Sequence, residues 1–154
     1  MRRIMRGQAG FTLLELLVVI AILGIIAGAF SLYLIRSLRQ SELRDAAYQL
    51  VGDLRRARTG AQKSGVVNQV KVATDSSDYT VKVGINAPVT LTLPHRVKVT
   101  EQSGGVALDY QPPFGTLAAT GASWKLTSPS NANLNLWVKA IGITGKVMLS
   151  ATEN

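Results

Sequence analysis

The pattern of hydrophobic and polar residues in this chain of 154 residues is typical of a helix before about residue 65 and typical of strands after it. The helical part begins with an apolar run that has no charged residue from position 16 to position 35. A helix needs about 20 apolar residues to cross the hydrocarbon core of a bilayer, so this run is long enough to span a membrane. Arginines on both sides weakly favour a cytoplasmic N-terminus, since more of them precede the run than follow it. They are Arg2, Arg3 and Arg6 before the run, and Arg36 and Arg39 after it.

Apolar residues then recur at steps of three and four, which is the pattern of a helix with one buried face. Gly65 is a typical helix end, and Lys63 in the last turn complements the helix dipole. No proline lies between Phe11 and Gly65. The sequence therefore predicts one continuous helix, with residues 11–35 in the membrane and residues 36–64 as an amphipathic continuation. The predicted buried face consists of Leu43, Ala46, Ala47, Leu50, Leu54, Ala57 and Ala61.

From residue 66 onward, apolar and polar residues alternate in short segments separated by turn signals. One long helix followed by many short strands predicts an α+β fold. We expect the helix to pack on an antiparallel β-sheet or small β-sandwich formed by residues 65–154. The expected strands are residues 66–73, 79–83, 89–93, 96–100, 106–110, 123–128, 134–140 and 145–150. The expected core comprises Val70, Val72, Val81, Val83, Leu91, Leu93, Val97, Val99, Leu126, Leu136, Val138, Val147 and Leu149.

Composition and charge narrow the function only a little. The chain has no cysteine, so it can form neither a disulfide nor a thiolate metal site. Its net charge is +8, and +5 remains without the three N-terminal arginines. A moderate positive charge suits anionic lipid, nucleic acid or an acidic protein, and it selects none of them.

Glu15 stands almost at the start of the apolar run, and a carboxylate at mid-bilayer costs about 2.5–3.5 kcal/mol. A plain membrane anchor explains the length of the run but not this acid. A secretory signal peptide explains the basic start, and Ala27-Gly28-Ala29 offers a cleavage site for it. However, signal peptides have apolar regions of about 7–15 residues without an acid near the start, and this run continues past Ala29.

The stretch GFTLLE at residues 10–15 follows a short basic leader and opens the apolar run. This arrangement resembles the cleavage and methylation signature of type IV pilins and of the pseudopilins of type II secretion systems. In that family a prepilin peptidase cuts after the glycine and methylates the new N-terminus. The resemblance implies that residues 1–10 are a leader peptide, that cleavage falls between Gly10 and Phe11, and that Phe11 becomes N-methylated.

Such a cleavage would place a positively charged amine on Phe11. When subunits pack their N-terminal helices side by side, Glu15 can meet that amine, either its own or a neighbour's. At an effective dielectric near 20, opposite charges about 4 Å apart attract by about 4 kcal/mol, which is enough to offset the insertion cost. Glu15 is therefore the candidate assembly residue. The alternative is that its carboxylate only reaches the lipid headgroups.

Within the pilin-like families the layout most resembles the GspH/FimT group of minor pseudopilins and minor pilins. The resemblance is carried by residues 57–66 at the helix end, by Tyr110-Gln111-Pro112 with Gly115, and by residues 145–147. Many pilins have a proline at the twenty-second mature position, where this chain has Leu32. The helix is therefore expected to run straighter here.

Some members of that group that serve DNA uptake carry a Gly-Arg-x-Arg motif in the tail. The matching residues 145–148 read Gly-Lys-Val-Met, so Lys146 alone keeps a charge. Arg44, Arg55 and Arg58 lie along one stripe of the predicted helix. This stripe is a solvated face, a set of arginines that pair with acids on adjacent subunits, or a phosphate-binding face. These four residues are the candidate nucleic-acid contacts of an alternative function, a DNA-binding minor pilin acting in natural transformation.

No catalytic or metal-binding constellation emerges from the sequence. His95 is the only histidine and is expected in an exposed loop, and Asp75 and Asp78 suit an Asx turn better than a calcium site. Three aromatic residues that could stack on bases fall in strand patterns and are expected to pack instead. They are Tyr110, Trp124 and Trp137. The chain is therefore expected to be no enzyme and to need no metal or cofactor.

The resemblance implies a minor pilin or pseudopilin, a structural subunit of a type II secretion pseudopilus or a type IV pilus. Its expected partners are the prepilin peptidase, other pilins or pseudopilins in a filament, and inner-membrane lipid. It is expected to cross the bacterial inner membrane once with residues 65–154 in the periplasm, or to be part of a filament.

Overall fold

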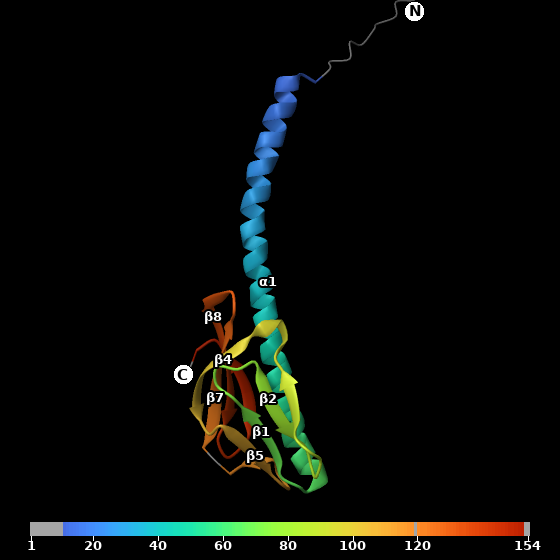
Figure 1. Cartoon of the computed structure of the whole chain (residues 1–154), viewed down its shortest axis with the longest axis vertical. Helices are drawn as coiled ribbons and strands as arrows, with labels where there is room; N and C mark the ends of the chain where they lie inside the picture. The colour runs from blue at the N-terminus through green and yellow to red at the C-terminus, as the bar shows by residue number, and fades with distance from the viewer. Residues whose placement is uncertain (1–10, 119, 153–154) are drawn as a thin grey trace, which may run out of the picture. The chain divides into compact units, whose positions relative to one another are not determined.

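The computed structural model describes residues 11–118 and 120–152 (Figure 1). The chain divides into two compact units between Ser37 and Leu38. We call the first the N-terminal unit and the second the head. The predicted leader, residues 1–10, and with it Gly10, lies outside the described residues.

One helix, α1, spans Leu13–Ser64, as the absence of proline predicted. It ends at Gly65, which has a φ of +68° and donates its N–H to the carbonyl of Ala61 at 3.2 Å. This left-handed residue closing the last turn is a common helix end. Within the head, every apolar position that was predicted for the buried face of the helix is buried, which confirms the predicted stripe.

The head contains two antiparallel sheets, which confirms the predicted α+β class. The first sheet has the order β3-β2-β1-β5-β6 and the second has the order β4-β7-β8-β9. The strands of the first sheet are β1 (Asn68–Val72), β2 (Asp78–Lys82), β3 (Val89–Thr92), β5 (Ala107–Gln111) and β6 (Thr116–Leu117). Those of the second are β4 (Lys98–Gly104), β7 (Gly121–Ser128), β8 (Asn131–Ile141) and β9 (Lys146–Ser150), and a 3-10 turn, Pro94–Arg96, precedes β4.

Each of the predicted strand segments overlaps one observed strand, and several strands begin or end a few residues outside the predicted bounds. β6 was not predicted, because a strand of two residues shows no alternation of apolar and polar positions. In three-dimensional order the strands are not sequential, since β5 and β6 join β1 while β4 joins β7. The second sheet therefore brings together residues that lie far apart in the sequence.

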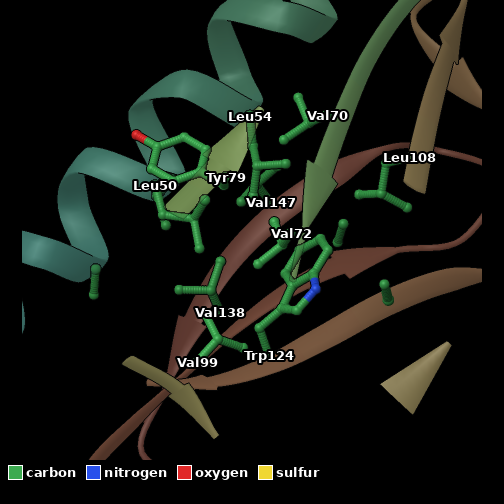
Figure 2. Packing of buried hydrophobic residues seen from close by; sticks show 14 of the residues in the cluster. Leu50, Leu54, Val70, Val72, Tyr79, Val99, Leu108, Trp124, Val138 and Val147 are labelled. Atoms are coloured by element: carbon green, nitrogen blue, oxygen red, sulfur yellow. The ribbon is translucent and has the colours of Figure 1, made fainter. Parts of the chain in front are cut away.

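The core of the head is formed by α1 together with both sheets (Figure 2). Leu50 and Leu54 of the helix belong to the same buried cluster as Val72 of β1 and Val138 of β8. Each fully buried leucine or valine contributes about 1.5–3 kcal/mol relative to an exposed one. Most residues predicted for the core are buried, and a few are only half-buried at its margin. The half-buried ones are Val83, Leu91, Leu136 and Leu149.

Aromatic residues fill the centre of this core to a greater extent than the sequence indicated. Trp124 of β7 and Tyr110 of β5 are fully buried, which confirms that they pack, and Tyr79 of β2 is buried with them. Trp137 is buried on the opposite face of the second sheet, where the ammonium of Lys125 lies 5.7 Å from its ring centroid. A lysine at this distance over an indole ring is a cation–π contact.

Asn68, the first residue of β1, is a buried polar residue that ties the helix to the first sheet. Its Nδ2 donates to the carbonyl of Ala57 at 2.8 Å, and its Oδ1 accepts from the N–H of Gly84. A Cβ on Gly60 would meet Asn68 Nδ2 at 2.5 Å, so the helix approaches closely at this point. Both functional groups of this amide are therefore in use.

We expect Asn68→Ala to lower the free energy of unfolding by about 1–3 kcal/mol, because it removes the buried hydrogen bond to the carbonyl of Ala57 and leaves the half-buried N–H of Gly84 without its acceptor. Urea denaturation of the purified chain measures this loss. Asn86→Ala is the matched control, since Asn86 is exposed and its loss should change stability by less than about 0.5 kcal/mol. Equal stabilities of the two variants would contradict the role given to Asn68.

At one end of the second sheet, three glycines let neighbouring backbones approach closely. A Cβ on Gly121 would collide with the carbonyl oxygen of Ala140 and would lie 2.6 Å from the nitrogen of Gly142. A Cβ on Gly104 would collide with the carbonyl of Gly121, and one on Gly142 with the carbonyl of Thr120. Gly121 also has a φ of +99°, which L side chains rarely adopt. All three positions therefore require glycine on steric grounds, and Gly104, with a φ of +90°, and Gly121 require it on conformational grounds as well.

Candidate functional site

The helix begins with a polar cap that includes the candidate assembly residue. Thr12 precedes α1, and its Oγ1 accepts a hydrogen bond from the backbone N–H of Glu15 at 3.2 Å. The carbonyl of Thr12 also accepts from the N–H of Leu16 at 3.2 Å. A threonine followed three residues later by a glutamate is a helix-start signature, and an acid in the first turn complements the positive end of the helix dipole. Glu15 thus suits the helix start in addition to any role between subunits.

Phe11 lies immediately before this cap and is 80% exposed. The bond that joins it to Gly10 is the predicted cleavage site, and Gly10 lies outside the described residues. The structure therefore describes only Phe11, the residue on the C-terminal side of that bond. On this side, a backbone nitrogen at Phe11 stands one residue ahead of Thr12 and one helical turn ahead of Glu15.

The surface of the N-terminal unit is apolar and lies open. All side chains from Phe11 to Ser37 are exposed, including a continuous series of leucines, isoleucines and valines. Among the described residues, α1 is the one helix long and apolar enough to cross a membrane, and its most apolar window has no buried residue. Exposing so large an apolar surface to water is unfavourable. We therefore expect this surface to contact lipid or other apolar helices.

Two glycines in this surface, Gly24 and Gly28, are four residues apart and lie on one side of the helix. A Cβ at either position would meet nothing within 4 Å. Small residues at this spacing let the backbone of a second apolar helix approach closely in a membrane. The N-terminal unit thus offers one side on which close helix packing is sterically open.

Two of the candidate nucleic-acid contacts bind the head itself. Arg55 Nη2 donates to the carbonyl of Val147 at 3.4 Å, and Arg58 Nε donates to the carbonyl of Gly115 at 3.3 Å. Because Val147 follows Lys146, these contacts bring Arg55 near the tail residue that was predicted with it. Arg55 and Arg58 therefore help to hold α1 on the strands, a role that the sequence did not predict.

The other two candidates, Arg44 and Lys146, have exposed side chains. Arg44 lies eleven residues before Arg55 on the helix, about 16 Å away along its axis. The four candidates therefore do not form one cluster. Lys146 opens β9 and lies on the outward side of the second sheet, opposite Ile141.

Asp53 belongs to a hydrogen-bond network between the helix and the first sheet that was not predicted from the sequence. The hydroxyl of Tyr79 donates to Asp53 Oδ2, and Arg56 Nη1 lies 3.1 Å from Asp53 Oδ1. Gln49 Nε2 donates to Tyr79 Oη at 3.0 Å and to the carbonyl of Thr92 at 3.2 Å. Burial, and then the hydrogen bond to Asp53, raise the pKa of Tyr79 well above its ordinary value of 10.

The remaining polar candidates lie in the 3-10 turn, at the start of β2 and in the core. His95 is exposed, as predicted, and its Nε2 is 4.0 Å from Asp45 Oδ2. Asp78 accepts a hydrogen bond from the hydroxyl of Thr92 at 2.7 Å and donates its N–H to Ser76 Oγ, as in a turn. Burial raises the pKa of Tyr110 to about 12, so this phenol stays neutral at physiological pH.

Comparisons with known proteins identify a motif at the N-terminus and a similar fold among solved structures. Residues 5–31 match the prokaryotic N-terminal methylation motif. The fold is similar to that of the type IV minor pilin FimU of Pseudomonas aeruginosa strain PAO1 in two crystal forms. No curated protein matches the chain significantly.

The similarity to FimU extends over most of both chains. For the P21 form the identity is 16% and the TM-score 0.57, with 74% of this chain and 92% of that chain covered. For the P65 form the identity is 17% and the TM-score 0.55, with 73% and 95% covered. At such low identity the likeness concerns the fold. The chain thus carries an N-terminal methylation motif ahead of a pilin-like fold, as the sequence predicted.

Proposed function

We propose that this protein is a minor pilin or pseudopilin, a structural subunit of a type IV pilus or of a type II secretion pseudopilus. A prepilin peptidase cuts it between Gly10 and Phe11 and methylates Phe11. The mature subunit sits in the bacterial inner membrane with its head in the periplasm, and it joins a filament through its N-terminal helix. The observation that supports this most directly is the methylation motif, which overlaps the apolar first half of α1, where every side chain up to Ser37 is exposed.

The chemistry of assembly follows from the first turn of that helix. Removal of residues 1–10 gives Phe11 a charged amine, and Glu15 supplies a carboxylate one turn further along. In an apolar environment each charge is costly alone, and pairing the two offsets part of that cost. When the carboxylate of Glu15 pairs with the amine of Phe11 on a neighbouring subunit, the two helices are held in one register. The open side at Gly24 and Gly28 lets those helices approach closely.

The role is structural and uses no catalytic group or cofactor. Filament subunits act through the surfaces that they present, here the apolar helix to neighbouring helices and the head to other subunits or to cargo. The hydrogen bonds of Arg55, Arg58 and Asp53 hold the strands of the head on the part of α1 that belongs to the head.

Processing provides the most direct test of this function. We expect mass spectrometry of the protein from cell membranes to show a chain that begins at Phe11 and carries one added methyl group. Gly10→Leu is the matched control, which should remain uncut and stay in the membrane at the same level. A native chain that keeps residues 1–10, or that begins after Ala29, would contradict the proposal, since the latter start is that of a cleaved signal peptide.

A further inference from the structure

Two neighbouring turns of the head present large apolar side chains to solvent. Phe114, in the turn between β5 and β6, is 72% exposed, and Ile143, in the turn between β8 and β9, is 75% exposed. A Cβ on Gly145 would lie 2.6 Å from the carbonyl oxygen of Gly115, so the two turns are in direct contact. We call Phe114 and Ile143 the apolar knob.

The backbone of the apolar knob is held firmly in place. Gln62 Nε2 donates to the carbonyl of Phe114 at 2.7 Å, and the carbonyl of Ile143 accepts from the N–H of Leu117 at 3.0 Å. Ile143 has a φ of +58°, which a β-branched residue rarely adopts. Strained backbone of this kind is concentrated at functional sites. A contact residue on a rigid backbone loses little conformational freedom when it binds, so the knob is suited to docking.

An apolar groove lies between α1 and the hairpin formed by β2 and β3. It has a volume of about 250 Å³, and its lining includes Val81, Val83, Val89, Leu91 and the guanidinium-bearing Arg56. We call this groove the socket. Val89 is exposed and Leu91 is half-buried, so the apolar lining can be reached from solvent.

The socket matches the aromatic ring of the knob in size and in chemistry. A cavity of about 150 Å³ with an aliphatic lining binds benzene, so the larger socket has room for the ring of Phe114. The Arg56 guanidinium at its side is a group that stacks on aromatic faces. Its contact with Asp53 Oδ1 at 3.1 Å holds this guanidinium beside the groove.

The knob and the socket lie on opposite flanks of the same helix. On one flank, Arg58 and Gln62 donate to the carbonyls of the turn that carries Phe114. On the other flank, Arg56 lines the socket and Gly60 lies against Val83. At 3.6 residues per turn, Arg58 is rotated by about 160° from Arg56, and Gln62 by the same angle from Gly60. The knob therefore cannot enter the socket of its own chain.

We propose that the apolar knob of one copy of this chain docks into the socket of a second copy, with the two heads side by side. Because the two surfaces differ, each contact leaves a free socket on one head and a free knob on the other, and it can repeat from copy to copy. The inference rests on the proposed function, since the N-terminal helices must gather the copies in one membrane or filament. This tethering raises the effective concentration of the heads, so a small contact suffices.

The absence of cysteine from the chain makes thiol crosslinking a direct test. Thr144→Cys places a thiol beside the knob, and Asn86→Cys places one at the rim of the socket, both at exposed positions. We expect a short bis-maleimide to give a crosslinked dimer in membranes of cells that make both single variants. Neither single variant alone should give a dimer. A chain that carries both cysteines should give a ladder of oligomers.

The contribution of the ring is measured by adding Phe114→Ser to the Thr144→Cys chain. The yield of dimer should fall by about tenfold or more, because burial of the ring is lost. Val106→Ser in the same chain is the matched control, since Val106 is 62% exposed but lies before β5 and belongs to neither surface. It should leave the yield unchanged. Urea denaturation should show equal stabilities for the two serine variants, because both side chains are exposed.

Three results would overturn the proposal. Equal yields with Phe114→Ser and Val106→Ser would remove the role of the ring, and dimers of Thr144→Cys alone would show a symmetric contact instead. Crosslinks to a different protein in place of a second copy would show another partner. If the mature chain begins at Phe11 and enters filaments but forms no dimer, this contact is refuted and the proposed function stands. The mass of the chain in the same membranes separates that case from a failure of processing.

Discussion

Replacing Glu15 by alanine is expected to abolish incorporation of the subunit into filaments while leaving its amount in the membrane unchanged. The pair between the Glu15 carboxylate and the amine of Phe11 is worth about 4 kcal/mol before desolvation, which corresponds to a roughly thousandfold change in an equilibrium. Insertion itself should become easier, because a carboxylate is removed from the apolar run. Immunoblots of sheared filaments and of membranes from the same cells measure the two quantities.

The structure makes it possible to separate the charge of Glu15 from its place in the helix cap. The cap uses the backbone N–H of Glu15, which any residue at this position retains. Glu15→Gln keeps the shape of the side chain and removes only the charge, so it should fail as alanine does. Thr12→Ala is the complementary control, since it removes the cap and keeps the charge, and it should assemble far better than Glu15→Gln. Normal assembly of Glu15→Gln would refute the role given to the charge.

Gly121→Ala is expected to destabilise the head by more than about 3 kcal/mol, a large part of the 5–15 kcal/mol that holds a typical domain folded. Two effects add. The φ of +99° costs an L residue about 1–3 kcal/mol, and the new Cβ would collide with the backbone of the neighbouring strand β8. The neighbour is main chain rather than a flexible side chain, so it cannot move aside cheaply. Urea denaturation followed by tryptophan fluorescence reports the loss, because Trp124 is fully buried.

Gly84→Ala is the matched control for this variant. Gly84 also has a positive φ, +65°, but a Cβ there would meet nothing within 4 Å. It should cost only about 1 kcal/mol, the conformational part alone. If the two variants lost the same stability, the close approach of the backbones at Gly121 would have no energetic weight.

The sequence predicted best what depends on local pattern. The helix, its end at Gly65 and the stripe from Leu43 to Ala61 follow from spacing alone, because burial of one helix face repeats every three to four residues. The eight longer strands follow in the same way from alternation. The candidate assembly residue was also found from the sequence, since a carboxylate at the start of an apolar run is conspicuous wherever it occurs.

What the sequence could not predict depends on which strands become neighbours. The order β4-β7-β8-β9 pairs β4 with β7, and no spacing along the chain marks these two strands as neighbours. The same holds for Asp53 and Tyr79, which lie 26 residues apart. Arg55 and Arg58 looked like solvent-exposed charges, because a carbonyl acceptor on a distant strand leaves no trace in the sequence.

The hydrogen bond between Arg55 and Val147 joins residues that are 92 positions apart. Contacts over such separations form slowly, because a long loop must close before they yield any stabilisation. Synthesis starts at the N-terminus, so the apolar segment is finished long before β9 leaves the ribosome. The bilayer can therefore receive this segment while the rest of the polypeptide is still unfolded, and the order of biogenesis is built into the connectivity of the chain.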